Sequence, residues 1–214
     1  MSNDPEHHPE AEQVPENYWP NVWQTKSPND VSWFQSDVQA TVDRIVGLTN
    51  SSDHVVDVGG GASVLVDALL SCSYTRLTVN DLSREALTFA RNRIGAAAEK
   101  VHWIDGDVRT LELAEPARLW HDRAVLHFLT DKPSTGAYVE SLARNVQRGG
   151  FAVISTFAAD GPTHCSGLAV TGRTPLELGS LFHGVGTVTE QWSEIHLTPW
   201  GAEQKFSGVV LRIG

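Results

Sequence analysis

The chain has 214 residues, 41% of them hydrophobic, which suits one domain with a sizeable core and leaves little room for a second. Its net charge of -10 disfavours a nucleic-acid partner, because phosphate binding draws on clustered Lys and Arg. Two cysteines are too few for a disulfide framework or a metal cluster, and no apolar run reaches the roughly 20 residues that span a bilayer. We therefore expect a cytoplasmic protein with no metal site and no membrane segment.

The first segment, 1–17, is rich in Glu, Pro and His and has almost no apolar residues, so we expect a disordered acidic tail. The next segment, 18–35, carries a cluster of aromatic residues without clear periodicity, among them Trp19 and Trp33. Such aromatics either fill a core or cap a ligand site. The stretch "SDVQATVDRIVGLTN" then predicts a helix, with Ser36 as its possible N-cap.

The middle of the chain alternates between short apolar runs and helical patterns. Strands are expected at 55–58, 76–80, 101–104, 118–121 and 151–157, and helices at about 62–71, 83–95 and 133–147. Strands that alternate with helices of this length form βαβ units, and hence a mostly parallel sheet with helices on both faces. The predicted fold class is α/β.

The C-terminal part departs from this alternation. Thr174, Pro175 and Glu177 form the capping-box pattern of a helix start. The β-like runs "TVTEQWSEIHLT" and "AEQKFSGVVLRI" follow with no helix between them, which predicts an antiparallel hairpin at the sheet edge. The segment 158–173 is a long loop rich in Gly, Pro and Ser, and we expect it to act as a lid.

The stretch "VVDVGGGASVLVDALL" turns from a strand into a helix through three glycines. In open α/β sheets such a turn lies where ligands bind, outside the carboxyl ends of the strands. The dinucleotide pattern G-x-G-x-x-G would use Gly59 and Gly61, but its third position is Val64. The turn alone therefore indicates a ligand site without identifying the ligand.

Acidic residues at three successive strand ends indicate which kind of ligand the site binds. Asp57 lies inside an apolar strand, where a carboxylate needs a partner such as a cationic ligand group. Asp81 ends the next strand and is well placed for ribose hydroxyls. Asp107 follows the third strand and offers an acceptor to a base amine, as Asp105 does less favourably. This arrangement suits a cofactor with an amino acid, a ribose and an adenine but no phosphate.

With these motifs in place, the chain resembles the class I S-adenosylmethionine-dependent methyltransferases. The resemblance rests on "VVDVGGGAS", "NDLS", "WIDGDV", "LWHDRAVLHFL" and "VQRGGFAVIST", in that order and spacing. The stretches "DRAVLHFL", "DGPTHCSGL" and "TPWGAEQKF" are similar to those of small bacterial members. The chain departs from the family at Arg148, where members usually have Pro, and at Ser63, where they have Gly. The resemblance implies a Rossmann-like, seven-stranded sheet in a single methyltransferase domain over 18–214.

The resemblance also implies roles for individual residues. Gly59 and Gly61 would approach the methionine portion of S-adenosylmethionine beside Asp57, while Asp81 with Leu82 would take the ribose. The adenine would be read by Asp107 and by the backbone of Val108. The residues that would lie beside the sulfonium as catalytic candidates are His121, Asp122 and Arg123, for which an Asp–Arg pair that merely fixes the loop is the alternative.

Five other residues are candidates for ligand binding, and each could instead simply pack in the core. Trp19 and Trp33 would attract the sulfonium through their ring faces, or simply fill the core. Cys165, His127 and His196 are candidate substrate-binding residues, with ordinary packing as the alternative.

The expected activity is methyl transfer by in-line displacement to a small-molecule acceptor, at a thiol or other soft nucleophile, an amine or a hydroxyl, with S-adenosylhomocysteine as product. A protein lysine methyltransferase, a non-catalytic nucleoside-binding protein and an NAD-dependent oxidoreductase are the alternatives. The accepting atom and the oligomeric state stay open.

Overall fold

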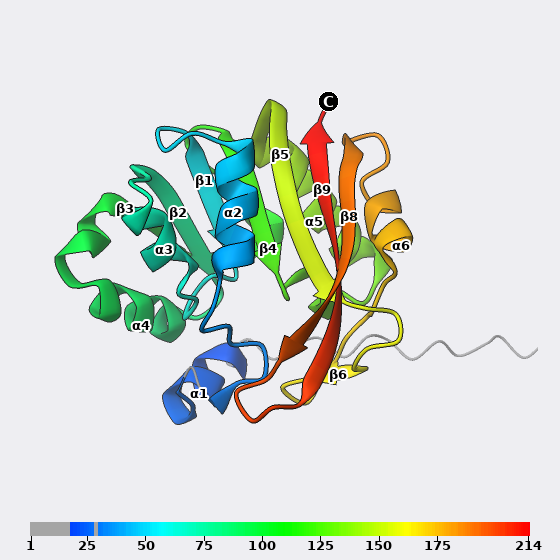
Figure 1. Ribbon diagram of the computed structural model, residues 1–214, viewed down its shortest axis with the longest axis horizontal. Helices are drawn as coiled ribbons and strands as arrows, with labels where there is room; N and C mark the ends of the chain where they lie inside the picture. Colours follow the sequence, from blue (N-terminus) through cyan, green and yellow to red (C-terminus); the bar gives the residue numbers. More distant parts are fainter. Residues whose placement is uncertain (1–17, 28–29) are drawn as a thin grey trace, which may run out of the picture.

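The computed structural model describes residues 18–27 and 30–214, so the predicted acidic tail, 1–17, lies outside the described residues. Seven strands form one sheet in the order β3-β2-β1-β4-β5-β9-β8 (Figure 1). Its strands are β1 (His54–Val58), β2 (Arg76–Asp81), β3 (Val101–Asp105), β4 (Ala117–Arg123), β5 (Val146–Phe157), β8 (Gly186–Leu197) and β9 (Glu203–Ile213). The first five are parallel, whereas β9 runs antiparallel to both β5 and β8. The predicted α/β class, the mostly parallel sheet and the terminal hairpin are confirmed.

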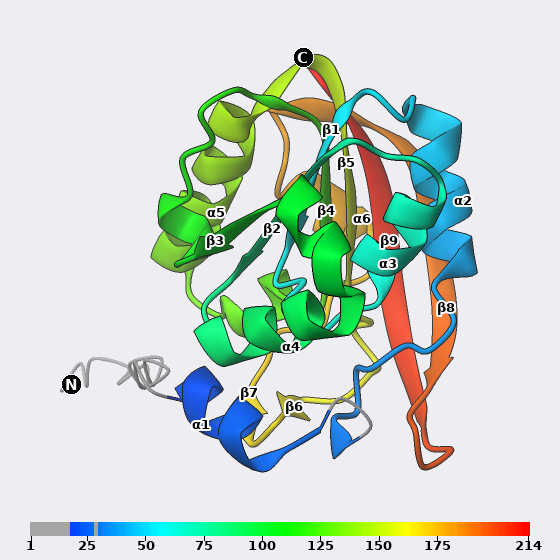
Figure 2. The same cartoon turned by 90° about the vertical axis from the view of Figure 1, so that its left-hand side faces the viewer.

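Helices cover both faces of the sheet, as expected (Figures 1 and 2). One face packs against α2 (Gln39–Leu48), α3 (Leu65–Ser71) and α4 (Arg84–Ile94), and the other against α5 (Lys132–Asn145) and α6 (Pro175–Ser180). Successive residues of β4 point to opposite faces of the sheet. Leu119 therefore packs in the core on the side of α2, α3 and α4, and Trp120 in the core on the side of α5 and α6. Short 3₁₀ turns, at Gly95–Lys100, Val108–Thr110 and Leu126–Phe128, connect some of these elements.

Of three helix starts predicted from the sequence, one agrees with the structure and two differ from it. The capping box before α6 is confirmed, because Thr174 accepts from the Glu177 backbone while Glu177 accepts from the Thr174 backbone. The predicted N-cap at Ser36 is wrong, since α2 begins only at Gln39 and has no side-chain cap. Helix α3 also begins later than predicted, because the glycine turn continues through Ser63, whose N–H donates to the Gly60 carbonyl at 2.9 Å.

Two segments outside the sheet lie near its C-terminal edge, where the parallel strands end (Figures 1 and 2). The aromatic segment forms helix α1 (Tyr18–Thr25), which the sequence pattern does not predict. The loop 158–173 contains a two-stranded hairpin, β6 (His164–Cys165) and β7 (Leu168–Ala169). The Tyr18 hydroxyl donates to the Ser166 carbonyl, so the two segments touch each other above the strand ends.

Candidate functional site

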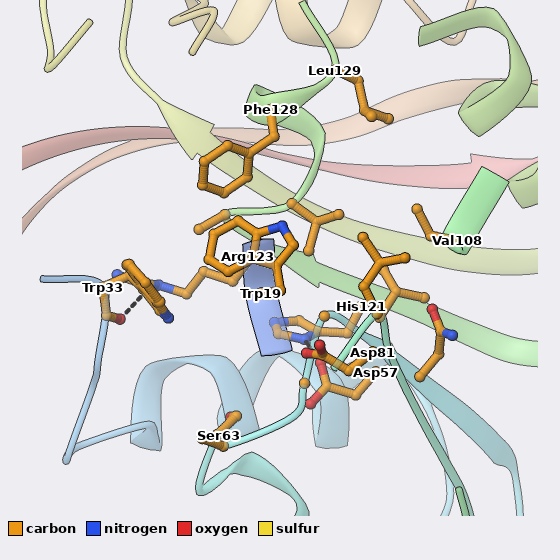
Figure 3. Close-up of a pocket in the computed structure, with 18 of the residues that line it drawn as sticks. Trp19, Trp33, Asp57, Ser63, Asp81, Val108, His121, Arg123, Phe128 and Leu129 are labelled. Carbon is orange, nitrogen blue, oxygen red and sulfur yellow. Dashed lines mark hydrogen bonds and ion pairs between the residues drawn. The ribbon is translucent and has the colours of Figure 1, made fainter. Parts of the chain in front are cut away.

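A cavity of about 1070 Å³ lies at the C-terminal edge of the sheet, between the strand ends and the aromatic segment (Figure 3). This volume is at the upper end of the range for small-molecule sites, roughly 300–1,000 Å³. The predicted site residues that line it are Trp19, Trp33, Asp57, Gly59, Asp81, Leu82, Asp107, Val108, His121 and Arg123. Five segments of the chain that are separate in sequence therefore meet around one space.

The glycine turn brings backbone to the wall of this cavity. Gly59 has φ +65°, and a Cβ there would lie 2.1 Å from the Val125 side chain. A Cβ on Gly60 would lie 2.3 Å from Oδ2 of Asp57. Gly61 does not line the cavity; its N–H donates to Oδ2 of Asp81 at 3.0 Å. Gly61 thus positions Asp81, while its approach to a ligand stays a prediction.

Asp57 and His121 form a buried pair on neighbouring strands. The two residues are register partners of β1 and β4, and Nδ1 of His121 lies 2.7 Å from Oδ1 of Asp57. The other carboxylate oxygen, Oδ2, has no hydrogen-bond partner among the described residues. Both side chains line the cavity, and Asp57 fixes the orientation of the imidazole. Oδ2 is shielded from solvent beside Gly60, so it can accept from a ligand donor only after the carboxylate turns toward the cavity.

Asp81 is held rigidly at the end of β2. Its two oxygens accept from the backbone N–H groups of Gly61 at 3.0 Å and Ser83 at 2.8 Å. An ionised carboxylate offers about four acceptor sites, so roughly two remain for a ligand. Burial raises the pKa of Asp81 to about 6, even though these two backbone N–H groups favour the ionised form. Leu82, the next residue, lines the same part of the cavity.

Asp107 is already engaged by a neighbouring arginine. Its carboxylate accepts from the Arg109 backbone N–H at 2.8 Å and from Nε of Arg109 at 2.9 and 3.0 Å. Partial burial acts to raise the pKa of Asp107, but the hydrogen bonds from Arg109 outweigh it and hold the pKa below its usual range. A base amine would therefore have to share this carboxylate with Arg109.

The end of β4 divides the three catalytic candidates between the two faces of the sheet. His121 and Arg123 line the cavity, whereas Asp122 lies fully buried on the opposite face. There it accepts from the Tyr138 hydroxyl at 2.6 Å and from the backbone N–H groups of Val125 and Leu126. Burial raises the pKa of Asp122 to about 6. The predicted catalytic role of Asp122 is therefore corrected. As in the alternative reading, this carboxylate fixes the loop after β4, but through Val125 and Leu126 and not through Arg123.

The three predicted substrate-binding residues do not line the cavity. Cys165 is buried among Ala124, Phe157 and Phe206, and burial raises the pKa of its thiol to about 12. His127 stacks on Phe157, with ring centroids 4.5 Å apart, and burial lowers its pKa to about 3. Nε2 of His196 lies 2.8 Å from the Ser32 carbonyl. All three positions agree with the alternative reading of ordinary packing.

The aromatic residues do line the cavity and form a cluster on one side of it. The rings of Trp19 and Trp33 meet edge to face with centroids 5.9 Å apart, and Trp19 meets Phe128 in the same way at 5.0 Å. Nη1 of Arg123 donates to the Trp33 carbonyl at 2.8 Å (Figure 3). Contacts from β4, from β8 and from the 158–173 loop therefore all hold the aromatic segment in place.

Three residues that contribute to the site, Asn80, Arg93 and Phe128, are not among those predicted from the sequence. Asn80 lines the cavity, and its side chain donates to the carbonyls of Ile104 and Gly106, which ties the ends of β2 and β3 together. Arg93 donates to the carbonyl of Ser63 at 2.5 Å and so braces the end of the glycine turn. Only Asn80 carries a sequence signal, its place beside Asp81, whereas Arg93 and Phe128 lie in ordinary helical or apolar runs.

Within residues 18–27 and 30–214, no cluster of three or more His, Cys, Asp or Glu is arranged to hold a metal ion. None of the helices in the same ranges has the length and apolar character required to cross a membrane.

Comparison with known proteins extends this picture. Residues 55–150 match the family model described as a methyltransferase domain. No curated protein sequence matches the chain significantly. Among solved structures, an S-adenosylmethionine-dependent methyltransferase from Anabaena variabilis is similar over 93% of both chains, with 16% identity and a TM-score of 0.74.

Two other similar structures contain bound molecules. The N-methyltransferase NodS from Bradyrhizobium japonicum, in complex with S-adenosylhomocysteine, has 16% identity and a TM-score of 0.62 over 82% of this chain and 86% of that one. The 1,6-didemethyltoxoflavin-N1-methyltransferase from Burkholderia thailandensis, with bound 1,6-didemethyltoxoflavin and S-adenosylhomocysteine, has 19% identity and a TM-score of 0.64 over 91% and 82%. At these identities the likeness shows the shared fold. Residues 55–150 therefore match a methyltransferase domain, and the chain shares its Rossmann-like fold with these S-adenosylmethionine-dependent methyltransferases.

Proposed function

We propose that the protein transfers a methyl group from S-adenosylmethionine to a small-molecule acceptor. The observation that carries this proposal is the row of carboxylates, Asp57, Asp81 and Asp107, at three neighbouring strand ends around one cavity. No phosphate is expected beside such a row, because each carboxylate would repel it.

The residues present fit the three parts of the methyl donor. The unpartnered Oδ2 of Asp57 suits its ammonium group once the carboxylate turns toward the cavity, and the remaining acceptor sites of Asp81 suit the ribose hydroxyls. Val108 and Asp107 line the part of the cavity at the end of β3, where the adenine is expected. The bound donor would supply a methyl group on a sulfonium, which is already a good leaving group.

The protein's own contribution is alignment and proton handling. Holding the reacting atoms about 3 Å apart in line lowers a barrier by roughly 7–11 kcal/mol, and this is the task of the walls around the β4 end. A thiolate acceptor needs no base. An amine or hydroxyl acceptor would give its proton to His121, whose imidazole lines the cavity and is oriented by Asp57. Asp122 lies on the other face of the sheet and cannot take this part.

Two observations favour a small acceptor over a protein side chain. The aromatic segment covers one side of the cavity and is fixed by Arg123, His196 and Ser166, which leaves less room for a polypeptide than for a small molecule. The similar Burkholderia enzyme binds a small molecule, 1,6-didemethyltoxoflavin. Against an NAD-dependent oxidoreductase stands Val64 at the third glycine position.

An acceptor screen tests this function. The protein is incubated with S-adenosylmethionine carrying a trideuterated methyl group and with pools of small thiols, amines and phenols, or with a protein extract. We expect S-adenosylhomocysteine to form only with a small-molecule pool, and the labelled methyl group to appear on one of its members. Label in the protein fraction alone would favour the lysine methyltransferase alternative, and donor binding without any transfer would favour the non-catalytic one.

A further inference from the structure

Arg123 is a cation whose hydrogen-bonding capacity is only partly used. Its side chain is 10% exposed and lines the cavity at the end of β4. Nη1 donates to the Trp33 carbonyl at 2.8 Å, but Nε and Nη2 are buried without a hydrogen-bond partner among the described residues. A buried charged group with unused N–H bonds costs free energy, so the fold maintains this arrangement at a penalty.

No carboxylate of the described chain satisfies this guanidinium. The nearest one, on Glu194 of β8, has Oε1 3.9 Å from Nε, which is beyond hydrogen-bond distance, and its side chain is 31% exposed. The guanidinium carbon lies instead 4.3 Å from the centre of the Phe206 ring. Burial lowers the pKa of Arg123 to about 10, so the group still carries its charge at neutral pH.

The strand order separates Arg123 from the donor's adenosine end. Asp107 follows β3, Asp81 ends β2, and Arg123 ends β4 on the far side of β1. Three strand spacings of about 4.8 Å place Arg123 roughly 14 Å along the edge from the end of β3. Trp33, whose carbonyl accepts from Arg123, belongs to the aromatic cluster with Trp19. Charge and apolar surface therefore adjoin at the acceptor end of the cavity.

We propose that Arg123 binds a carboxylate of the methyl acceptor, and that the acceptor has an aromatic or apolar body which packs against the aromatic cluster. Nε and Nη2 lie on one edge of the planar guanidinium, and their two parallel N–H bonds match a carboxylate. Both atoms are shielded from solvent, so binding requires the guanidinium to turn from Phe206 toward the cavity. The acceptor's carboxylate would then accept the hydrogen bonds from Nε and Nη2 that Glu194, with Oε1 3.9 Å from Nε, is too far away to accept.

This inference rests on the proposed function and is tested separately from it. The protein is first saturated with S-adenosylhomocysteine, and that titration alone tests the donor site. It is then titrated calorimetrically with benzoate, 1-naphthoate and indole-3-acetate, each beside its neutral amide. We expect at least one carboxylate to bind roughly tenfold or more tightly than its amide, as charged hydrogen bonds imply. If no carboxylate in the panel exceeds its amide while S-adenosylhomocysteine binds, the inference fails and the proposed function stands.

Four variants identify the residue responsible. Arg123→Gln should abolish the preference for the carboxylate, and Arg123→Lys, which keeps the charge without the two-pronged edge, should reduce it. Glu194→Gln removes the competing carboxylate and should strengthen the preference severalfold. Arg118→Gln is the matched control, because Arg118 lies near the other end of β4, donates to the Gly149 carbonyl and does not line the cavity. A preference that survives in Arg123→Lys unchanged, or that weakens in Glu194→Gln, overturns the assignment.

Discussion

The carboxylate of Asp81 gives the sharpest prediction about the donor site. In the Asp81→Asn variant, the side chain keeps its volume but loses its charge and one acceptor oxygen. Because hydrogen bonds to a charged group contribute about 1.5–3 kcal/mol, we expect S-adenosylhomocysteine to bind about 10- to 150-fold more weakly at pH 8. The fold should survive, since burial penalises the charge by a raised pKa, from 3.8 to about 6. That penalty, on the order of 3 kcal/mol, offsets the lost backbone hydrogen bond, which costs roughly 1–3 kcal/mol.

The same pKa predicts how binding depends on pH. The ribose site needs the ionised carboxylate, which is present above pH 6 and lost as the pH falls through about 6. Wild-type affinity should therefore fall about tenfold between pH 7 and pH 5, since a site one unit below its pKa is about one-tenth ionised. The sign for stability is opposite: a raised carboxyl pKa favours the fold at low pH, and this contribution is lost as the pH rises from about 4 to about 6.

Calorimetric titration with S-adenosylhomocysteine at pH 5, 6, 7 and 8 measures both effects. The Asp81→Asn variant should lose most of the wild type's pH dependence. Asp105→Asn is the control, because Asp105 lies at the same sheet edge, pairs with Arg84 at 2.8 Å and does not line the cavity. Equal affinities for wild type and Asp81→Asn at pH 8, or an unchanged pH profile in the variant, would show that Asp81 does not hold the ribose.

Three further predictions concern the glycine turn, the buried Asp122 and the two cysteines. Gly60→Ala should strongly weaken donor binding, because its Cβ would meet Oδ2 of Asp57 at 2.3 Å; wild-type affinity by calorimetry would contradict this. Asp122→Ala leaves the N–H groups of Val125 and Leu126 without an acceptor at about 1–3 kcal/mol each, so its melting temperature should fall by roughly 4–24 °C while a folded sample still binds the donor. A thiol reagent at pH 8 should label the exposed Cys72 in the native protein and reach the buried Cys165 only after unfolding, whereas two rapid labels in the native state would refute the burial.

The sequence predicts the fold well because its signals are local and repeated. Apolar runs alternate with helical patterns, and parallel strands bring their carboxyl ends to one edge, so the convergence of Asp57, Asp81 and Asp107 follows from topology alone. The capping box before α6 is equally local, since all its members lie within four residues.

The division of the β4 end between two faces could not be predicted with the same certainty. Strand alternation separates Asp122 from His121 and Arg123, but it does not say which face meets the cavity. That choice depends on the pairing of His121 with Asp57, 64 residues earlier, and on the Tyr138 hydroxyl that satisfies Asp122. Such long-range contacts have no signature in a short stretch of sequence.

The burial of Cys165 is hidden for a similar reason. The Gly- and Ser-rich loop gives no strand pattern, yet Ser166 and Gly167 adopt positive φ angles of 51° and 82° and close the β6–β7 hairpin. The hairpin turns the thiol into the cluster with Phe157 and Phe206. The sequence motif predicts a cysteine at the substrate, whereas in the structure the thiol is buried among these aromatic residues.

The central claim is that the row of strand-end carboxylates binds the methyl donor. Calorimetric titration of the wild-type protein with S-adenosylmethionine, S-adenosylhomocysteine and NAD, each at pH 8, tests it most directly. We expect saturable one-to-one binding of the first two and none of NAD, whose pyrophosphate would lie at the glycine turn beside the carboxylate of Asp57. Tight binding of NAD together with no heat from S-adenosylmethionine or S-adenosylhomocysteine would contradict it.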